Sequence, residues 1–254
     1  MATYKKRGYK PKNKAEEQEL EAQKSTTAEV FSTLDESASR SEQWVSRNQN
    51  IILGTIGVVA IAVLGYLAYT QFVQNPREES AANELYYPQQ YFDQALNATA
   101  KDSLFNLALN GAEGKYGFLD IIAEYDGTKA ANLANYSAGM AYLNMQQYQD
   151  AIRYLEDFSS DDAMLGALAK GGIGDAFMQL GQPNEALSYY EEALEHNTND
   201  FTTPRYLYKA GITSMELNQH EKALTYFNRV KEEFPDSQEA STIDVFIGMA
   251  QKGV

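Results

Sequence analysis

The sequence predicts an all-α protein in which a single transmembrane helix precedes a solenoid of paired helices. Three observations lead to this prediction. Residues 51–73 are apolar and uncharged, apolar residues beyond them recur at intervals of three and four positions, and a pattern of small and large residues returns at intervals of 35 and 37 residues. Runs of alternating apolar and polar residues, which indicate strands, are nearly absent.

The composition excludes several classes of protein. The 254 residues include no cysteine, so a disulfide-stapled domain, a thiolate zinc site and a cysteine nucleophile are ruled out. The formal net charge of −14 argues against a nucleic-acid-binding protein, because such proteins use a surplus of Lys and Arg to displace counterions. The charge is unevenly placed: residues 1–50 carry +1, residues 51–73 carry none and the remainder carries −15.

The first 50 residues divide into two parts. Residues 1–26 hold too few large apolar side chains to form a core, which predicts a tail that is disordered or folds only on a partner. Residues 27–50 are predicted to be an amphipathic juxtamembrane segment that lies on lipid or on a membrane partner. The apolar residues that recur there at roughly helical spacing are Val30, Phe31, Leu34, Ala38 and Val45.

Residues 51–73 are the predicted transmembrane helix. At about 1.5 Å per residue, a helix of this length reaches roughly 34 Å, which crosses a hydrocarbon core of about 30 Å. The stretch is too long, and begins too far along the chain, for a cleavable signal peptide. Arg40 and Arg47 precede it, whereas Arg77 after it is followed by two glutamates. This asymmetry predicts a cytoplasmic N-terminus and an exported C-terminal domain.

A stripe of small residues runs along this helix, formed by Gly54, Gly57, Gly65 and Ala68. One interpretation is a face on which a second membrane helix packs closely. The alternative is that small residues are simply common in membrane helices.

Residues 74–254 contain three similar units. In each unit a glycine precedes an alanine by twelve residues, and a large apolar residue follows that alanine by four. The three sets are Gly139, Ala151 and Leu155; Gly174, Ala186 and Tyr190; and Gly211, Ala223 and Phe227. The pattern resembles the tetratricopeptide repeat, a two-helix unit of about 34 residues. The glycine lets the two helices of a unit approach closely, and the alanine fills the crossing.

The repeats are expected at about 132–165, 167–201 and 204–236, with residues 237–252 as a capping helix that covers the last unit. Before them, residues 117–125 are expected to form the second helix of an atypical opening repeat. Residues 78–97 are expected to form a helix that is interrupted at Pro88.

The whole arrangement resembles a family. A basic tail, the sequence EQWVSRNQN at residues 42–50, one membrane helix and an exported repeat domain are similar to the YfgM-type ancillary subunit of the bacterial Sec translocon. The resemblance implies a single-pass protein of the bacterial inner membrane with its C-terminal domain in the periplasm. It also implies the SecYEG channel, a PpiD-like chaperone and exported polypeptides as partners. The residues alone predict a membrane-anchored binding module. The alternative is a structural adaptor of another envelope complex, in secretion or motility machinery, that holds one fixed partner.

The concave face of a tetratricopeptide superhelix is lined mainly by the first helix of each unit. Transferred to this sequence, the lining positions are Leu133, Tyr136, Met140, Leu143, Leu168, Gly171, Asp175, Met178, Arg205, Tyr208, Ile212 and Met215. Only Arg205 suits a clamp for a C-terminal carboxylate, so we expect a groove rich in Met, Leu and Tyr that repacks around varied apolar segments. The alternative is that the helix of residues 78–97 fills this groove.

The sequence predicts no enzyme activity, no cofactor and no metal site. His196 and His220 are the only histidines, and we expect both to be exposed near turns without a nucleophile beside them. The glycines of residues 171–174 and 111–115 lack the spacing of a phosphate-binding loop. The acidic residues Glu191, Glu192 and Glu195 are interpreted as a solvated helix face, with the steering of basic partners as the alternative.

Overall fold

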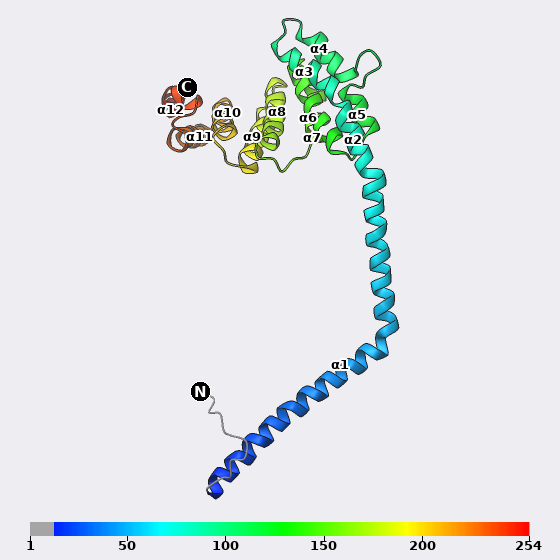
Figure 1. Ribbon diagram of the computed structural model, residues 1–254. Coiled ribbons are helices and arrows are strands. Elements are labelled where there is room, and N and C mark those ends of the chain that lie inside the picture. Colours follow the sequence, from blue (N-terminus) through cyan, green and yellow to red (C-terminus); the bar gives the residue numbers. More distant parts are fainter. Residues whose placement is uncertain (1–12, 254) are drawn as a thin grey trace. The chain divides into compact units, whose positions relative to one another are not determined.

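The computed structural model describes the backbone of residues 13–253, with side chains described throughout residues 42–253 and at fewer positions before them. The described chain is helical without a named strand, which confirms the all-α prediction (Figure 1). It forms two units, Met1–Tyr69 and Thr70–Val254. Residues 1–12 of the expected tail, and the side chains of Phe31, Leu34 and Ala38, lie outside the described residues.

The first unit contains one helix, α1, Lys14–Tyr69. It begins thirteen residues before the predicted amphipathic segment of residues 27–50, within the part for which the sequence predicts a disordered tail. Residues 14–24 are mostly Ala, Glu, Gln, Leu and Lys, which are the best helix formers, so local propensity carries the helix further toward the N-terminus.

The apolar part of α1 is exposed along its whole length. Ile51, Ile61 and Tyr66 are 70%, 73% and 66% exposed, and a Cβ added to Gly54, Gly57 or Gly65 would meet no atom within 4 Å. Within the described residues, one helix is long and apolar enough to cross a membrane. Side chains this apolar are stable only when something other than water covers them.

The second unit begins with a π-helical turn, Thr70–Gln74, followed by α2, Asn75–Glu84, α3, Tyr86–Asn97, α4, Lys101–Asn110, and α5, Phe118–Glu124. The break between α2 and α3 falls at Leu85, three residues before the expected interruption at Pro88. Proline has no backbone N–H and is tolerated in the first helical turn, where that N–H has no partner. Pro88 therefore sits, buried, in the first turn of α3.

Six further helices form three consecutive pairs. They are α6, Lys129–Asn144, with α7, Tyr148–Glu156; α8, Leu165–Gln179, with α9, Pro183–His196; and α10, Thr202–Glu216, with α11, His220–Glu233. A short 3₁₀ turn, Glu239–Thr242, and α12, Ile243–Lys252, follow. Each helix from α5 to α12 packs against the next, so neighbours in the chain are neighbours in space (Figure 1). This stacking is the arrangement of a helical-repeat protein.

The glycine pattern of the sequence corresponds to the closest helix crossings. A Cβ added to each repeat glycine would lie less than 3.0 Å from the large side chain of the second helix: Gly139 from Leu155, Gly174 from Tyr190 and Gly211 from Phe227. The alanines of the pattern, Ala151, Ala186 and Ala223, are fully buried. The spacing therefore identifies the points at which the two helices of each pair touch.

Candidate functional site: two grooves of the repeat domain

The first groove, here called the central groove, has a volume of about 610 Å³ and lies among α6, α8, α9 and α10. Five of the twelve predicted lining residues meet in it: Leu143, Asp175, Met178, Tyr208 and Ile212. The other lining residues are Lys101, Asn144, Gln146, Tyr148, Gln179, Tyr190, Lys209 and Thr213. More than half of the lining residues therefore have polar or charged side chains.

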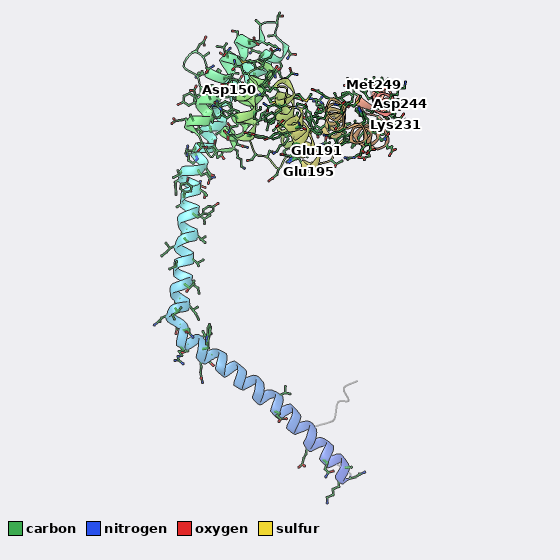
Figure 2. All side chains as sticks on the ribbon, turned by 180° about the vertical axis from the view of Figure 1, so that it is seen from behind. Asp150, Glu191, Glu195, Lys231, Asp244 and Met249 are labelled. Atoms are coloured by element: carbon green, nitrogen blue, oxygen red, sulfur yellow. The ribbon has the colours of Figure 1, made fainter. Side chains whose placement is uncertain are left out.

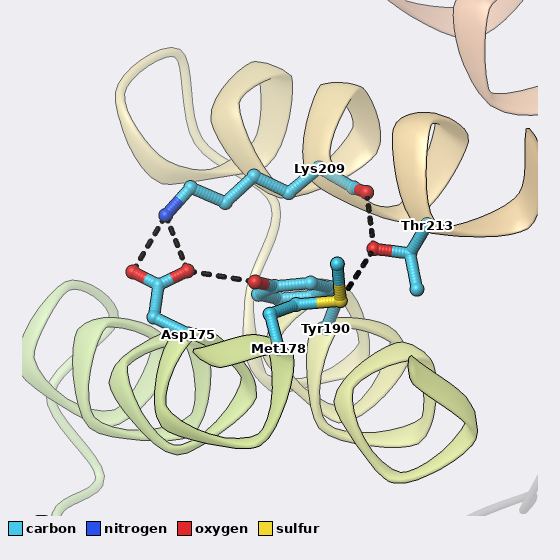
Figure 3. Close-up of polar contacts among 5 residues, drawn as sticks. All are labelled: Asp175, Met178, Tyr190, Lys209 and Thr213. Carbon is cyan, nitrogen blue, oxygen red and sulfur yellow. Dashed lines mark hydrogen bonds and ion pairs between the residues drawn. The ribbon is translucent and has the colours of Figure 1, made fainter. Parts of the chain in front are cut away.

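An ion pair lies in the wall of the central groove (Figure 3). The Lys209 ammonium donates to both carboxylate oxygens of Asp175, at 2.5 and 2.6 Å, and the Tyr190 hydroxyl donates to Asp175 Oδ1 at 2.7 Å. Burial, assisted by the negative charge of Asp175, raises the pKa of Tyr190 above its ordinary value. The Tyr190 hydroxyl therefore keeps its proton and remains a donor. The three side chains come from α8, α9 and α10, so the network joins two neighbouring repeats.

The same wall fixes a methionine. The Thr213 hydroxyl lies 3.5 Å from Met178 Sδ and donates to the Lys209 carbonyl oxygen at 2.9 Å (Figure 3). Met178 is thus held between two repeats. The central groove is more polar and more fixed than the Met-, Leu- and Tyr-rich groove that the sequence suggested.

The predicted groove residues outside the central groove serve other contacts. Tyr136 and Met140 pack in the interior with Leu155 and Ile173. Gly171 is buried against the ring of Tyr206, and Met215 packs against the core formed by the last helices. The guanidinium of Arg205 lies 5.2 Å from the ring centre of Phe201. Leu168 is partly buried, and Leu133 lies in the second groove.

Lys209 is the functional side chain that the sequence reasoning missed. Together with Lys101, it brings positive charge into the central groove, which Arg205 does not line. Lys209 follows Asp175 by 34 residues, about one repeat, and both lie on first helices. An opposite charge at one repeat interval was therefore a visible signal, because such positions face each other when repeats stack.

The second groove, here called the N-terminal groove, consists of two adjoining hollows of about 1080 and 570 Å³. Both are lined by Ala82, Leu85 and Leu133. The larger hollow is also lined by Leu104 and by a polar row on α3, namely Gln89, Gln90, Asp93, Gln94 and Asn97. Leucines therefore line one part of this groove and side-chain amides another.

Residues 78–97 do not line the central groove. Instead, α2 packs on α3 and α6, and α3 packs mainly on α4. The ring centres of Phe92 and Phe105 are 5.4 Å apart, and those of Phe92 and Phe118 are 6.2 Å apart. The segment thus forms the start of the helical stack and leaves the central groove open.

Both histidines are half-buried, which corrects the expectation that they are exposed. His196 Nε2 lies 2.9 Å from the Asp162 carbonyl oxygen, and its ring covers Gly166. His220 Nδ1 is buried at the start of α11. The sequence could not reveal this, because the neighbours of both rings come from other helices of the stack: Gly166 on α8 for His196 and Gly253 at the end of α12 for His220. Among the described residues, no group of three or more His, Asp or Glu side chains is placed to hold a metal ion.

The acidic helix face is partly paired. Glu191 lies 2.7 Å from Lys222 Nζ and accepts from the Tyr226 hydroxyl, while Glu192 lies 2.5 Å from Lys170 Nζ. Figure 2 shows Glu191 and Glu195 on the same side of α9. Glu191 thus connects α9 to α11 and Glu192 connects α9 to α8, while both carboxylates also face water.

Comparison with known proteins agrees with the fold. A 55-residue stretch is 38% identical to tetratricopeptide repeat protein 21B of Mus musculus, a match that covers 22% of this chain and 4% of that protein. The chain thus spans a small part of that relative. The family model described as "T7SS, ESX-1 secretion system protein EccA1, N-terminal domain" matches residues 78–244. Since this match covers most of the chain and nearly all of its second unit, the chain is a helical-repeat protein that belongs to this family.

Proposed function

We propose that the chain is a membrane-anchored ancillary subunit of the SecYEG protein-export channel. In this proposal α1 is a single-pass anchor in the bacterial inner membrane, with its N-terminus in the cytoplasm and the repeat domain in the periplasm. The repeat domain binds a PpiD-like chaperone, newly exported polypeptides or both. The observation that carries the proposal is that one chain joins an exposed apolar helix to a helical-repeat domain with open grooves.

The proposal that α1 is a membrane anchor rests on the exposure of its apolar side chains. The large apolar side chains of residues 51–73 are exposed, and lipid is the environment in which such side chains are stable. The open stripe of Gly54, Gly57, Gly65 and Ala68 is the proposed face for a helix of the channel.

The docking part rests on the central groove. Leu143, Met178, Tyr208 and Ile212 are partly exposed there, beside the Asp175–Lys209 pair. Apolar side chains beside a fixed ion pair favour a partner of defined sequence. A folded chaperone meets this requirement better than a varied set of unfolded chains.

Co-purification tests the proposal. Cells that produce the full-length protein with a photoreactive amino acid at position 178 are irradiated. The protein is then extracted in mild detergent and purified by an affinity tag. Adducts to the channel or to a periplasmic chaperone support the proposal. The matched control carries the photoreactive group at Met164, which is 48% exposed and lies outside both grooves. Equal adducts from positions 178 and 164 would contradict docking in the central groove.

The second candidate is a structural adaptor of another envelope complex, and the family match favours it. The matched family is named for a secretion-system protein, ESX-1 EccA1. Recovery of a defined secretion machine without the channel would replace the first proposal by this one. Orientation is tested separately: protease added outside spheroplasts should digest the repeat domain, and an intact domain would overturn the topology.

A further inference from the structure

We propose that the N-terminal groove is a second binding site, and that it takes an extended polypeptide segment in which apolar residues are flanked by Lys or Arg. The inference rests on the proposed function for the origin of the segment, a polypeptide partner of the exported domain. The chemistry of the segment comes from the groove itself.

The floor of the groove is apolar and open. Leu133 is 36% exposed, although Ala130 and Ala134 beside it on α6 are buried. Leu85 and Leu104 line the hollow with it. A hollow of about 1080 Å³ is at the upper end of small-molecule sites, which occupy about 300–1,000 Å³, and an adjoining hollow extends it. The groove therefore has room for several residues of a chain.

The amide row favours an extended occupant. Gln90 and Gln94 are exposed on α3, and the side-chain amide of neither makes a hydrogen bond within the described part of the chain. They are one turn apart, about 6 Å along the helix, whereas an extended chain presents equivalent backbone groups on one side about every 6.6 Å. Each side-chain amide both donates and accepts, so it can pair with a peptide group of any sequence. A helical occupant would already have paired its own backbone groups.

The charge of the groove lining predicts which residues flank the apolar core of the bound segment. The lining contains the carboxylates Glu78, Glu79 and Asp93 but one ammonium group, Lys129. Glu78 is occupied, because the Lys129 backbone N–H donates to its two oxygens at 2.9 and 3.0 Å. Glu79 lines the smaller hollow and Asp93 the larger, where Asp93 Oδ1 accepts from the Gln89 amide at 3.0 Å and the carboxylate keeps its charge. Basic residues on both sides of an apolar core complement this arrangement, whereas a second copy of the acidic repeat domain does not.

Peptide binding tests the site. Full-length protein in detergent micelles is titrated into three fluorescein-labelled nonapeptides, and fluorescence anisotropy gives the dissociation constants. The first peptide has an apolar core with two lysines at each end, the second has glutamates in place of the lysines, and the third has serines in place of the core. We expect the first to bind at least tenfold more tightly than the other two. Its advantage over the glutamate peptide should shrink as salt is raised.

Variants locate the site on the protein. Leu133→Glu should weaken the lysine-flanked peptide at least tenfold, and the double change Gln90→Ala with Gln94→Ala should weaken it about threefold or more. The matched control is Leu96→Glu, since Leu96 lies on the same helix α3, is 56% exposed and does not line the groove. It should leave binding within twofold. All four positions are exposed, so the fold should survive, and circular dichroism verifies this for each variant.

Four outcomes overturn the inference. They are no binding of the lysine-flanked peptide, equal binding of the lysine and glutamate peptides, equal effects of Leu133→Glu and Leu96→Glu, and tighter binding of a stapled helical form of the same peptide. If Met178→Glu abolishes binding while Leu133→Glu does not, the segment binds in the central groove instead. In each case the co-purification experiment still judges the proposed function independently.

Discussion

Replacing Gly211 with alanine should destabilise the repeat domain, although the same change stabilises most helices. In an unhindered helix, alanine is favoured over glycine by about 1 kcal/mol. At Gly211 the new Cβ would enter the space of the Phe227 ring, which is fully buried. The ring cannot easily move, because the ring centres of Tyr208 and Phe246 lie 6.3 and 5.7 Å from its own. Overpacking typically costs about 1–3 kcal/mol, which exceeds the gain of about 1 kcal/mol, so we expect a net loss of up to about 2 kcal/mol.

Gly248→Ala is the matched control. Gly248 lies within α12, and a Cβ there would meet nothing within 4 Å, so this variant should gain about 1 kcal/mol. For a domain of about 150–250 residues, each kcal/mol shifts the melting temperature by about 2–4 °C, so the two variants should melt on opposite sides of the parent protein. Near-ultraviolet circular dichroism of the tyrosines is the suitable assay, because the single tryptophan, Trp44, lies in α1. A Gly211→Ala protein that melts at or above the parent temperature would refute the close-crossing argument.

The remaining predictions concern polar groups. Asp175→Ala should lower the free energy of urea unfolding by about 1–3 kcal/mol, because it leaves the Tyr190 hydroxyl without an acceptor. Lys209→Met should lower it by less, about 1 kcal/mol. A larger loss from Lys209→Met than from Asp175→Ala would contradict this order. Ser214→Ala should stabilise the domain by up to about 1 kcal/mol, since the Ser214 hydroxyl is fully buried without a hydrogen-bond partner. A lower melting temperature of this variant would show that the hydroxyl does have a partner. Burial, with the hydrogen bond to Glu156, raises the pKa of Tyr189 from 10.0 to about 12, so its contribution to stability is complete below pH 10 and is lost as the pH rises through 12. Tyr189→Phe should therefore make the pH-dependent loss of stability over this range shallower, as measured by urea unfolding at several pH values.

The sequence predicts the parts of the fold that depend on spacing within one repeat. The intervals from Gly174 to Ala186 and Tyr190 identify a helix crossing because each helix imposes a fixed geometry on its own side chains. The helix boundaries near Lys14 and Leu85 are harder to predict from the sequence. They depend on propensity summed over a turn and on where a proline can be accommodated, and neither has one sharp signal.

The grooves depend on contacts between repeats, and the sequence predicts them less well. Met178 and Met215 occupy equivalent positions of consecutive repeats, yet Met178 lines the central groove while Met215 lies outside it and packs against the core formed by the last helices. The difference comes from the neighbouring repeat, which offers Thr213 and Lys209 beside Met178. Transferring lining positions from a general repeat therefore identifies the helix that faces a groove, but not which of its side chains remain open.

The two grooves differ in what they can select. In the central groove, Lys209 satisfies Asp175, so a partner must match a preformed arrangement or break an ion pair, and either favours one defined protein. In the N-terminal groove, exposed amides lie beside leucines, so the backbone of any segment can pair there, and the apolar core and the flanking charges of the segment set the preference. If both sites are used, the chain can hold a fixed partner and a variable segment at the same time. Competition between the lysine-flanked peptide and the co-purified partner would then be absent, whereas a single shared site would show it.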